Sequence, residues 1–298
     1  MQPHLIAVFQ ALFVVFLWAT SWVFVKFGLR DIPPVTFAGL RYFLAFICLS
    51  MVLLFGETKR EIKQLSLKTW GKFAVLGILF YAVTQGAIFV ALAYLPAVTV
   101  NLLWSFSSVT VALMGVVWLS ENPTILQWSG SLLAIAGAFV YFYPVAVPQS
   151  QFIGMTVALL GILANAVSSI LGRDINRTGK HHPLVITVIS MGVGSILLLV
   201  AGIATEGMPV ITLQGWGIIL WLALVNTAFA FTLWNHTLRT LTALESSIIN
   251  GTMMIWIPTL AVLFLGETIT IKGLIGLVMA GAGTLIVQLR KSPANKTT

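Results

Sequence analysis

Long apolar runs follow one another along almost the whole chain, separated only by short polar segments. A helix needs about 20 apolar residues to cross the hydrocarbon layer of a bilayer. Charged residues make up only 8% of the 298 residues, too few for the surface of a soluble protein. The sequence therefore predicts an all-α integral membrane protein with ten transmembrane helices. The ten runs are residues 5–27, 35–55, 71–93, 97–118, 125–143, 152–172, 183–204, 214–235, 243–264 and 271–289.

Lysine and arginine are distributed unequally between the two sides that these ten spans define. If the amino terminus is inside, twelve of these residues face the cytoplasm and four face outward: Lys26, Arg30, Arg41 and Lys272. Basic residues are enriched in cytoplasmic loops. Because the number of spans is even, we expect both termini in the cytoplasm. The net charge of +8 then reports topology, and no nucleic-acid partner is expected.

One charged segment between two apolar runs, here called the acidic corner, occurs twice in the chain. The segment "LSENPTILQ" at residues 119–127 returns as "LGETITIKG" at residues 265–273. A shift of 146 residues gives eight identities in nineteen positions and pairs Glu121 with Glu267. The repeating unit is five helices, residues 1–146 and 147–298, so the second copy enters the bilayer from the opposite face. We predict two inverted five-helix repeats.

Inverted repeats are the architecture of many secondary transporters, in which two related halves expose a midplane site alternately to each side. Duplication can also serve only to build a stable bundle. The repeat therefore favours a carrier that works by alternating access.

Several runs carry polar or aromatic residues at helical spacing, which place them on one face of each helix. Polar side chains are unfavourable against lipid, so such stripes indicate helix contacts or a water-filled cavity. The amides suit cavity lining and structural hydrogen bonding about equally, whereas the serines fit helix packing better. The candidate substrate-binding residues are Trp18, Tyr81, Gln85, Asn101, Trp104, Ser105, Asn165, Ser169, Asn226 and Asn250.

Three further residues are candidates for gating or charge. Lys26 lies near the outer end of its run, where its ammonium can reach the headgroups. Arg41 lies about two turns inside its run, so we expect it to face a partner or an outer vestibule. Pro258 interrupts the run 243–264, where it can provide a hinge or a static kink.

Other classes of protein lack support in the sequence. No aspartate or glutamate lies in the middle of a run, which disfavours a proton-coupled carrier of lipophilic cations. Enzyme motifs, paired-cysteine metal spacings and channel filter motifs are absent, so we expect no cofactor and no metal. The only cysteine, Cys48, excludes a disulfide within the chain.

The chain resembles the EamA-type transporters of the drug/metabolite transporter superfamily. The resemblance rests on Leu17 and Trp18, on "PVTFAGLR" at residues 34–41, and on the acidic corners followed by "QWSGSLLAIAG" and "KGLIGLVMAGAG". The first corner reads Ser-Glu where the family usually has Gly-Glu. The resemblance implies a prokaryotic inner-membrane carrier, often an exporter of amino acids or related metabolites, with a central cavity. The residues that it makes cavity candidates are Trp18, Tyr81, Gln85, Asn101, Trp104, Asn165, Asn226 and Asn250.

We therefore expect a monomeric exporter of small amphipathic metabolites, with amino acids as the leading substrate class. Its partners are the solute and the lipid bilayer. Multidrug, nucleoside and sugar carriers of the same fold remain alternatives, and a membrane-embedded enzyme or a channel is a more distant one.

Overall fold

The computed structural model describes residues 3–56, 58–119, 124–143, 148–177 and 180–288, and all regular structure in these residues is helical. This confirms the predicted all-α class. The elements are α1 (Pro3–Gly28), α2 (Pro34–Phe55), α3 (Lys59–Ile62), α4 (Leu67–Gly77), η1 (Ile78–Thr84), α5 (Gln85–Tyr94), α6 (Ala97–Leu119), α7 (Ile125–Phe142), α8 (Gln149–Arg177), α9 (Pro183–Glu206), α10 (Leu213–Ala223), η2 (Leu224–Phe229), α11 (Ala230–Thr237), α12 (Ala243–Gly251), α13 (Met253–Leu265) and α14 (Ile271–Gln288).

The helices combine into ten spans, as the sequence predicts. Nine spans in the described residues are long and apolar enough to cross a membrane, and the tenth is α6, with the apolar segment Ala97–Val111. Two spans are composite: α4, η1 and α5 form the third, and α10, η2 and α11 form the eighth. The ninth span is interrupted between α12 and α13 at Thr252.

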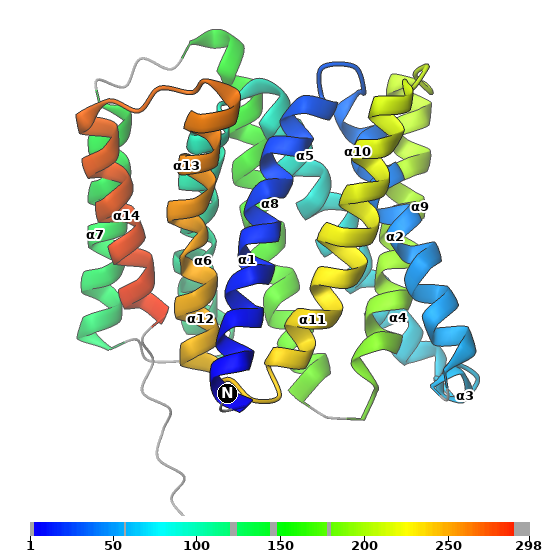
Figure 1. The fold of residues 1–298 in the computed structure, drawn as a ribbon. Helices are drawn as coiled ribbons and strands as arrows, with labels where there is room; N and C mark the ends of the chain where they lie inside the picture. The colour runs from blue at the N-terminus through cyan, green and yellow to red at the C-terminus, as the bar shows by residue number, and fades with distance from the viewer. Residues whose placement is uncertain (1–2, 57, 120–123, 144–147, 178–179, 289–298) are drawn as a thin grey trace, which may run out of the picture.

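The first helix begins on the same side of the bundle on which the last one ends (Figure 1). We call this side the lower face and the opposite side the upper face. Helix α6 ends at the lower face, whereas its counterpart α13 ends at the upper face (Figure 1). The protein is thus built from two inverted five-helix repeats. Glu121 and the predicted boundary between residues 146 and 147 lie outside the described residues.

Helices α7 and α14, which close the two repeats, lie side by side at one edge of the bundle (Figure 1). Their crossing is made by the small residues that the repeat shares. A Cβ built at Gly137 would lie 2.5 Å from the Ala280 backbone nitrogen, and one at Gly283 would lie 2.4 Å from that of Ala134. The paired glycines therefore allow the two backbones to approach closely.

Helices α2 and α9 are joined by a carboxylate at each end. On the upper face, Glu206 at the end of α9 accepts hydrogen bonds from the backbone amides of Val35 and Thr36 at 3.2 and 2.9 Å. Towards the lower face, Glu61 follows α2 and accepts one from the backbone amide of His182 at 3.1 Å. Each carboxylate satisfies amides at the start of the opposite helix, where the helix dipole favours negative charge.

Candidate functional site

Two π-helical segments lie in the third and eighth spans at matching positions of the repeat. The segment η1 begins at Ile78 and η2 at Leu224, 146 residues apart. In each, a threonine hydroxyl donates to the carbonyl five residues earlier: Thr84 to Leu79 and Thr227 to Leu222, both at 2.8 Å. Short π-helical segments occur frequently at functional sites because they redirect side chains. These segments carry two of the predicted site residues, Tyr81 and Asn226.

Arg41 lies between α2, α5 and η2, with 6% of its surface exposed. Its Nε donates to the Thr227 hydroxyl at 3.2 Å. Its guanidinium carbon lies 5.1 Å from the ring centre of Tyr42 and 5.8 Å from that of Phe89. The Arg41 charge is therefore held inside the helical bundle, by one hydroxyl and two aromatic faces.

Tyr42 connects this arginine with two predicted site residues. Its hydroxyl donates to Gln85 Oε1 at 2.7 Å, and its ring centre lies 5.7 Å from that of Tyr81. Both tyrosines are almost fully buried. The second and third spans thus bring Arg41, Gln85 and Tyr81 together around one ring. Sequence reasoning had not selected Tyr42 or Thr227, and the only available signal was their position beside Arg41 and Asn226 in the chain.

Asn226 and Trp18 join the first span to the eighth. The Asn226 amide nitrogen donates to the Leu17 carbonyl and to the Thr20 hydroxyl, the latter at 3.3 Å, and the residue is fully buried. Trp18 packs against Phe231 and Trp234 of α11 at ring distances of 5.3 and 5.2 Å. Within the described residues, Trp18 Nε1 and Asn226 Oδ1 are buried without a hydrogen-bond partner.

A second group of predicted residues lies between α6 and α8. The Asn165 amide donates to the Ser107 hydroxyl, and Trp104 lies against Gly161, where an added Cβ would be 2.8 Å from its ring. The Asn101 amide nitrogen is buried and lacks a partner among the described residues. The Ser105 hydroxyl donates to the Leu102 carbonyl of its own helix. The contacts of Trp104 and Asn165 therefore connect the two repeats.

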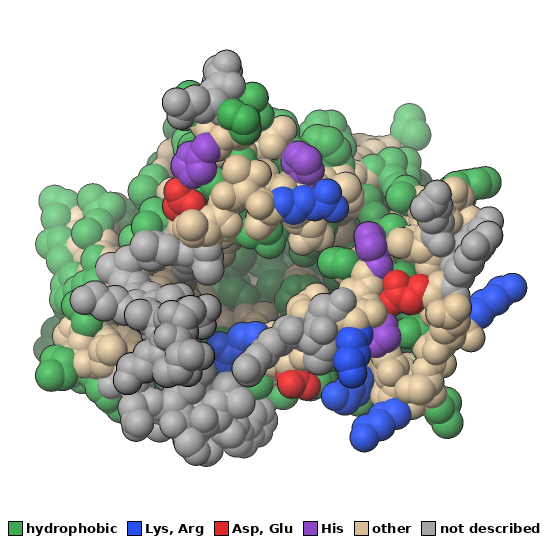
Figure 2. Space-filling view, turned by 90° about the horizontal axis from the view of Figure 1, so that it is seen from below, with side chains coloured by type: hydrophobic (Ala, Val, Ile, Leu, Met, Phe, Trp, Pro, Cys, Tyr) green, Lys and Arg blue, Asp and Glu red, His purple; other side chains and the backbone are tan. Residues whose placement is uncertain are grey.

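Ser169 and Asn250 are exposed, and the Ser169 hydroxyl donates to the Asn165 carbonyl of its own helix at 2.7 Å. Figure 2 shows that the lower face of the molecule is hollowed near its centre, with hydrophobic side chains inside the hollow and basic side chains and histidines around it. A separate pocket of about 320 Å³ lies between the α1–α2 corner and α10. It is lined by Arg30, Asp31 and Gln214 among others, and by none of the predicted residues.

Contacts at the corner between α5 and α6 hold several helices together at the upper end of the bundle. Lys26 Nζ donates to the Leu95 carbonyl at 2.6 Å. From the α13–α14 corner, Glu267 accepts hydrogen bonds from the amides of Ala97 and Val98 at 2.6 and 3.0 Å. Lys26 is therefore not a free headgroup anchor, because it ties the first span to this corner.

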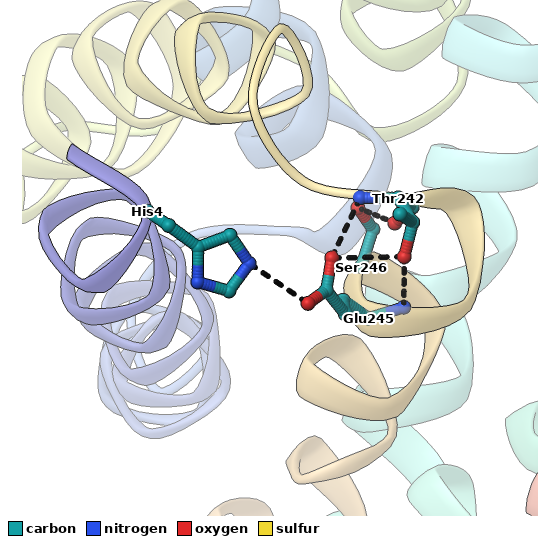
Figure 3. Close-up of polar contacts among 4 residues, drawn as sticks. All are labelled: His4, Thr242, Glu245 and Ser246. Atoms are coloured by element: carbon teal, nitrogen blue, oxygen red, sulfur yellow. Dashed lines mark hydrogen bonds and ion pairs between the residues drawn. The ribbon is translucent and has the colours of Figure 1, made fainter. Parts of the chain in front are cut away.

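A smaller contact joins the starts of α1 and α12 on the lower face (Figure 3). His4 Nε2 lies 2.8 Å from Glu245 Oε1. Glu245 in turn accepts hydrogen bonds from the backbone amide and the hydroxyl of Thr242, both at 2.8 Å, in a capping box. Both His4 and Glu245 are partly solvent-exposed, so this contact is a peripheral connection.

Pro258 lies within α13, whereas the ninth span breaks at Thr252, six residues earlier.

Among the described residues, no three His, Cys, Asp or Glu side chains form a group that could hold a metal ion. What the structure assembles is a set of hydrogen-bonding and aromatic groups within a helical bundle. The bundle has ten spans in two inverted repeats, and polar groups from both repeats lie in its interior. This architecture defines a membrane carrier.

The chain belongs to the EamA-like transporter family, which matches residues 5–143 and 152–289. This is a family of carriers and not of enzymes, and its double match coincides with the two repeats. Membership of this family makes the chain a multi-pass membrane transporter, whose partners are a small-molecule solute and the bilayer.

Two relatives that match most of the chain are named as a transporter and as an efflux pump. The "Uncharacterized transporter YoaV" of Bacillus subtilis is 23% identical and covers 91% of this chain and 92% of its own length. The "Probable amino-acid metabolite efflux pump" of Salmonella typhimurium is 26% identical and covers 93% of both chains. One solved crystal structure, 16% identical, covers 94% of this chain and 95% of its own with a TM-score of 0.66, which shows the same fold.

Proposed function

We propose that this protein exports small amphipathic metabolites, amino acids foremost, across the cytoplasmic membrane of a prokaryote by alternating access. The observation that carries the proposal is the asymmetry of the bundle. At its upper end, Lys26 and Glu267 hold the helix ends together, whereas its lower face is hollowed (Figure 2). The efflux-pump names of the relatives support export and amino acids as the solute.

The lower face is the cytoplasmic one in this proposal, and the protein acts as a monomer. Lysine and arginine enrichment in the loops of that face supports the orientation. Solute enters the hollow from the cytoplasm, and the α5–α6 and α11–α12 hairpins then rock about the site, with α1 and α8 moving alongside. This motion opens the upper end and closes the lower one.

The function is tested by counterflow in proteoliposomes with labelled amino acids, nucleosides and sugars. Accumulation of amino acids alone is the expected result. Accumulation of nucleosides or sugars alone would replace the substrate class and keep the carrier. A blank screen together with a hydrolytic or transferase activity would contradict the carrier itself.

The orientation is tested with single cysteines at two exposed positions in a Cys48→Ser background, Arg239 on the lower face and Thr268 on the upper. In intact cells, an impermeant maleimide should label Thr268→Cys and leave Arg239→Cys unlabelled. The reverse pattern would show that the molecule is inserted the other way round.

Replacing Trp104 by alanine should lower counterflow about tenfold, because it removes a large aromatic surface from the contact between the repeats. Trp104 lies between the repeats, against Gly161. The matched control is Trp128→Ala, which removes an exposed indole from the edge helix α7. Equal losses in the two variants, or no loss in Trp104→Ala, would remove Trp104 from the transport path.

A further inference from the structure

Arg41 is a deeply buried cation for which the described residues supply no carboxylate. The ion pairs found there join His4 to Glu245, Lys72 to Asp174 and His181 to Glu61, and none involves Arg41. Of its guanidinium nitrogens, only Nε makes a hydrogen bond within the described part of the chain. A guanidinium has five N–H donors, so most of its hydrogen-bonding capacity is unused.

Such an arrangement is unfavourable unless an anion compensates it. Removing a charge from water is costly, and charged side chains in membrane spans usually pair with one another or with backbone carbonyls. The rings of Tyr42 and Phe89 offset part of this cost by cation–π attraction. They neutralise no charge, however, so the site still favours a negatively charged group.

The Arg41 guanidinium reaches towards the depth at which a carrier binds its solute. Arg41 is the eighth residue of α2, about 10 Å along the helix from its upper end. Its partner Thr227 lies near the middle of the span Leu213–Thr237, inside the π-helical segment. Substrate sites of inverted-repeat carriers lie near the bilayer midplane.

A second donor adjoins the guanidinium. Gln85 uses its Oε1 to accept from Tyr42, and its Nε2 has no hydrogen-bond partner among the described residues. Gln85 and Phe89 are four residues apart on α5 and therefore share one face of that helix. Because the Arg41 guanidinium lies over Phe89 and beside Tyr42, the free donors of Arg41 and Gln85 belong to one cluster.

We propose that the terminal nitrogens of Arg41, together with Gln85 Nε2, bind the carboxylate of the transported solute. This inference rests on the proposed carrier function and specifies its substrate class. A guanidinium binds a carboxylate through two parallel hydrogen bonds, and one positive charge balances one negative charge, which fits a monocarboxylate better than a dianionic phosphate. Thr227 is a positioning residue, because its hydroxyl holds Arg41 Nε while donating to Leu222.

The test compares solutes that share a phenyl or an isobutyl scaffold and differ in their charged groups. Each series contains the amino acid, its amide, the decarboxylated amine and the carboxylate without an amino group. Binding to the purified full-length protein is measured from the rise in melting temperature with solute concentration. We expect the two carboxylates of a series to bind and the amide and the amine to bind at least about tenfold more weakly.

The variant Arg41→Gln should abolish this discrimination, and Arg41→Lys should keep part of it, since the charge remains but the bidentate geometry is lost. Arg41→Lys also serves if Arg41→Gln does not fold. Thr227→Val should weaken carboxylate binding and leave binding of the amide unchanged. The matched control is Arg30→Gln, because Arg30 also lies 5.1 Å from an aromatic ring, that of Phe27, but is exposed.

Failure of this inference can be told apart from failure of the proposed substrate. If the parent protein binds the amide and the amine as well as the amino acid, amino-acid transport stands and the carboxylate site is wrong. If it binds the carboxylates without an amino group and not the amino acids, the site stands and the amino-acid proposal is wrong. Unchanged discrimination in Arg41→Gln, or no binding across both series, overturns the inference.

Discussion

Replacing Gly137 by leucine should abolish the yield of folded protein in detergent. Even a single added carbon at this position would lie 2.5 Å from the Ala280 nitrogen and 2.6 Å from the Gly276 carbonyl oxygen. Those atoms belong to the backbone of α14, which cannot yield without moving the whole helix. Overpacking a tight contact typically costs ~1–3 kcal/mol, and a leucine pressed against backbone costs more.

The control for this variant is Gly217→Leu on α10, where an added Cβ meets no atom within 4 Å. Size-exclusion chromatography and the melting temperature of both variants check the result. We expect Gly137→Ala to fold with a lowered melting temperature and Gly217→Leu to behave like the parent. A monodisperse Gly137→Leu protein with the parent's melting temperature would disprove the close crossing of α7 and α14.

Replacing Glu267 by alanine should open the upper end of the bundle. Its carboxylate accepts hydrogen bonds from the first amides of α6, an arrangement in which the charge and the helix dipole reinforce each other. Hydrogen bonds to charged groups contribute ~1.5–3 kcal/mol each, so losing this carboxylate should shift the open–closed equilibrium by at least about tenfold. The hydrogen bond from Lys26 to the Leu95 carbonyl remains in this variant and limits the shift of the open–closed equilibrium.

A cysteine at Asn101, one turn inside α6 and 5% exposed, reports the opening. In a Cys48→Ser background, an impermeant maleimide added from the upper side should react with Asn101→Cys at least about tenfold faster when Glu267 is replaced. The control is Asp174→Ala, which removes a carboxylate from an exposed pair with Lys72. An unchanged rate would assign the closure to other contacts.

The ten spans could be predicted because length and hydropathy are local properties. Each apolar run must form its backbone hydrogen bonds within itself in lipid, so the run becomes a helix wherever its neighbours lie. The repeat was equally visible, since its identities stand in the chain at a fixed distance. The glycines of those identities then proved to form the α7–α14 crossing, although their partners could not be read from the spacing.

The π-helical segments illustrate the limit of pattern reading. Nothing in the composition of residues 78–84 or 224–229 separates them from an ordinary apolar helix. Their equivalence emerged only from the structure, in which the two segments begin 146 residues apart. The carboxylate caps were also missed, because Glu206 and Glu267 bond to amides about 170 residues away in the chain.

The sequence by itself determined the membrane class, the ten helices and the inverted duplication, since these depend on hydrophobicity and on similarity along one chain. The tertiary structure alone decided which polar groups are satisfied and which are free. The side-chain nitrogens of Asn226 and Asn165 donate to neighbouring helices, whereas Arg41 and Gln85 keep donors that no described residue accepts. That difference depends on which side chains meet in space, because a buried donor is satisfied by whatever acceptor packing brings to it.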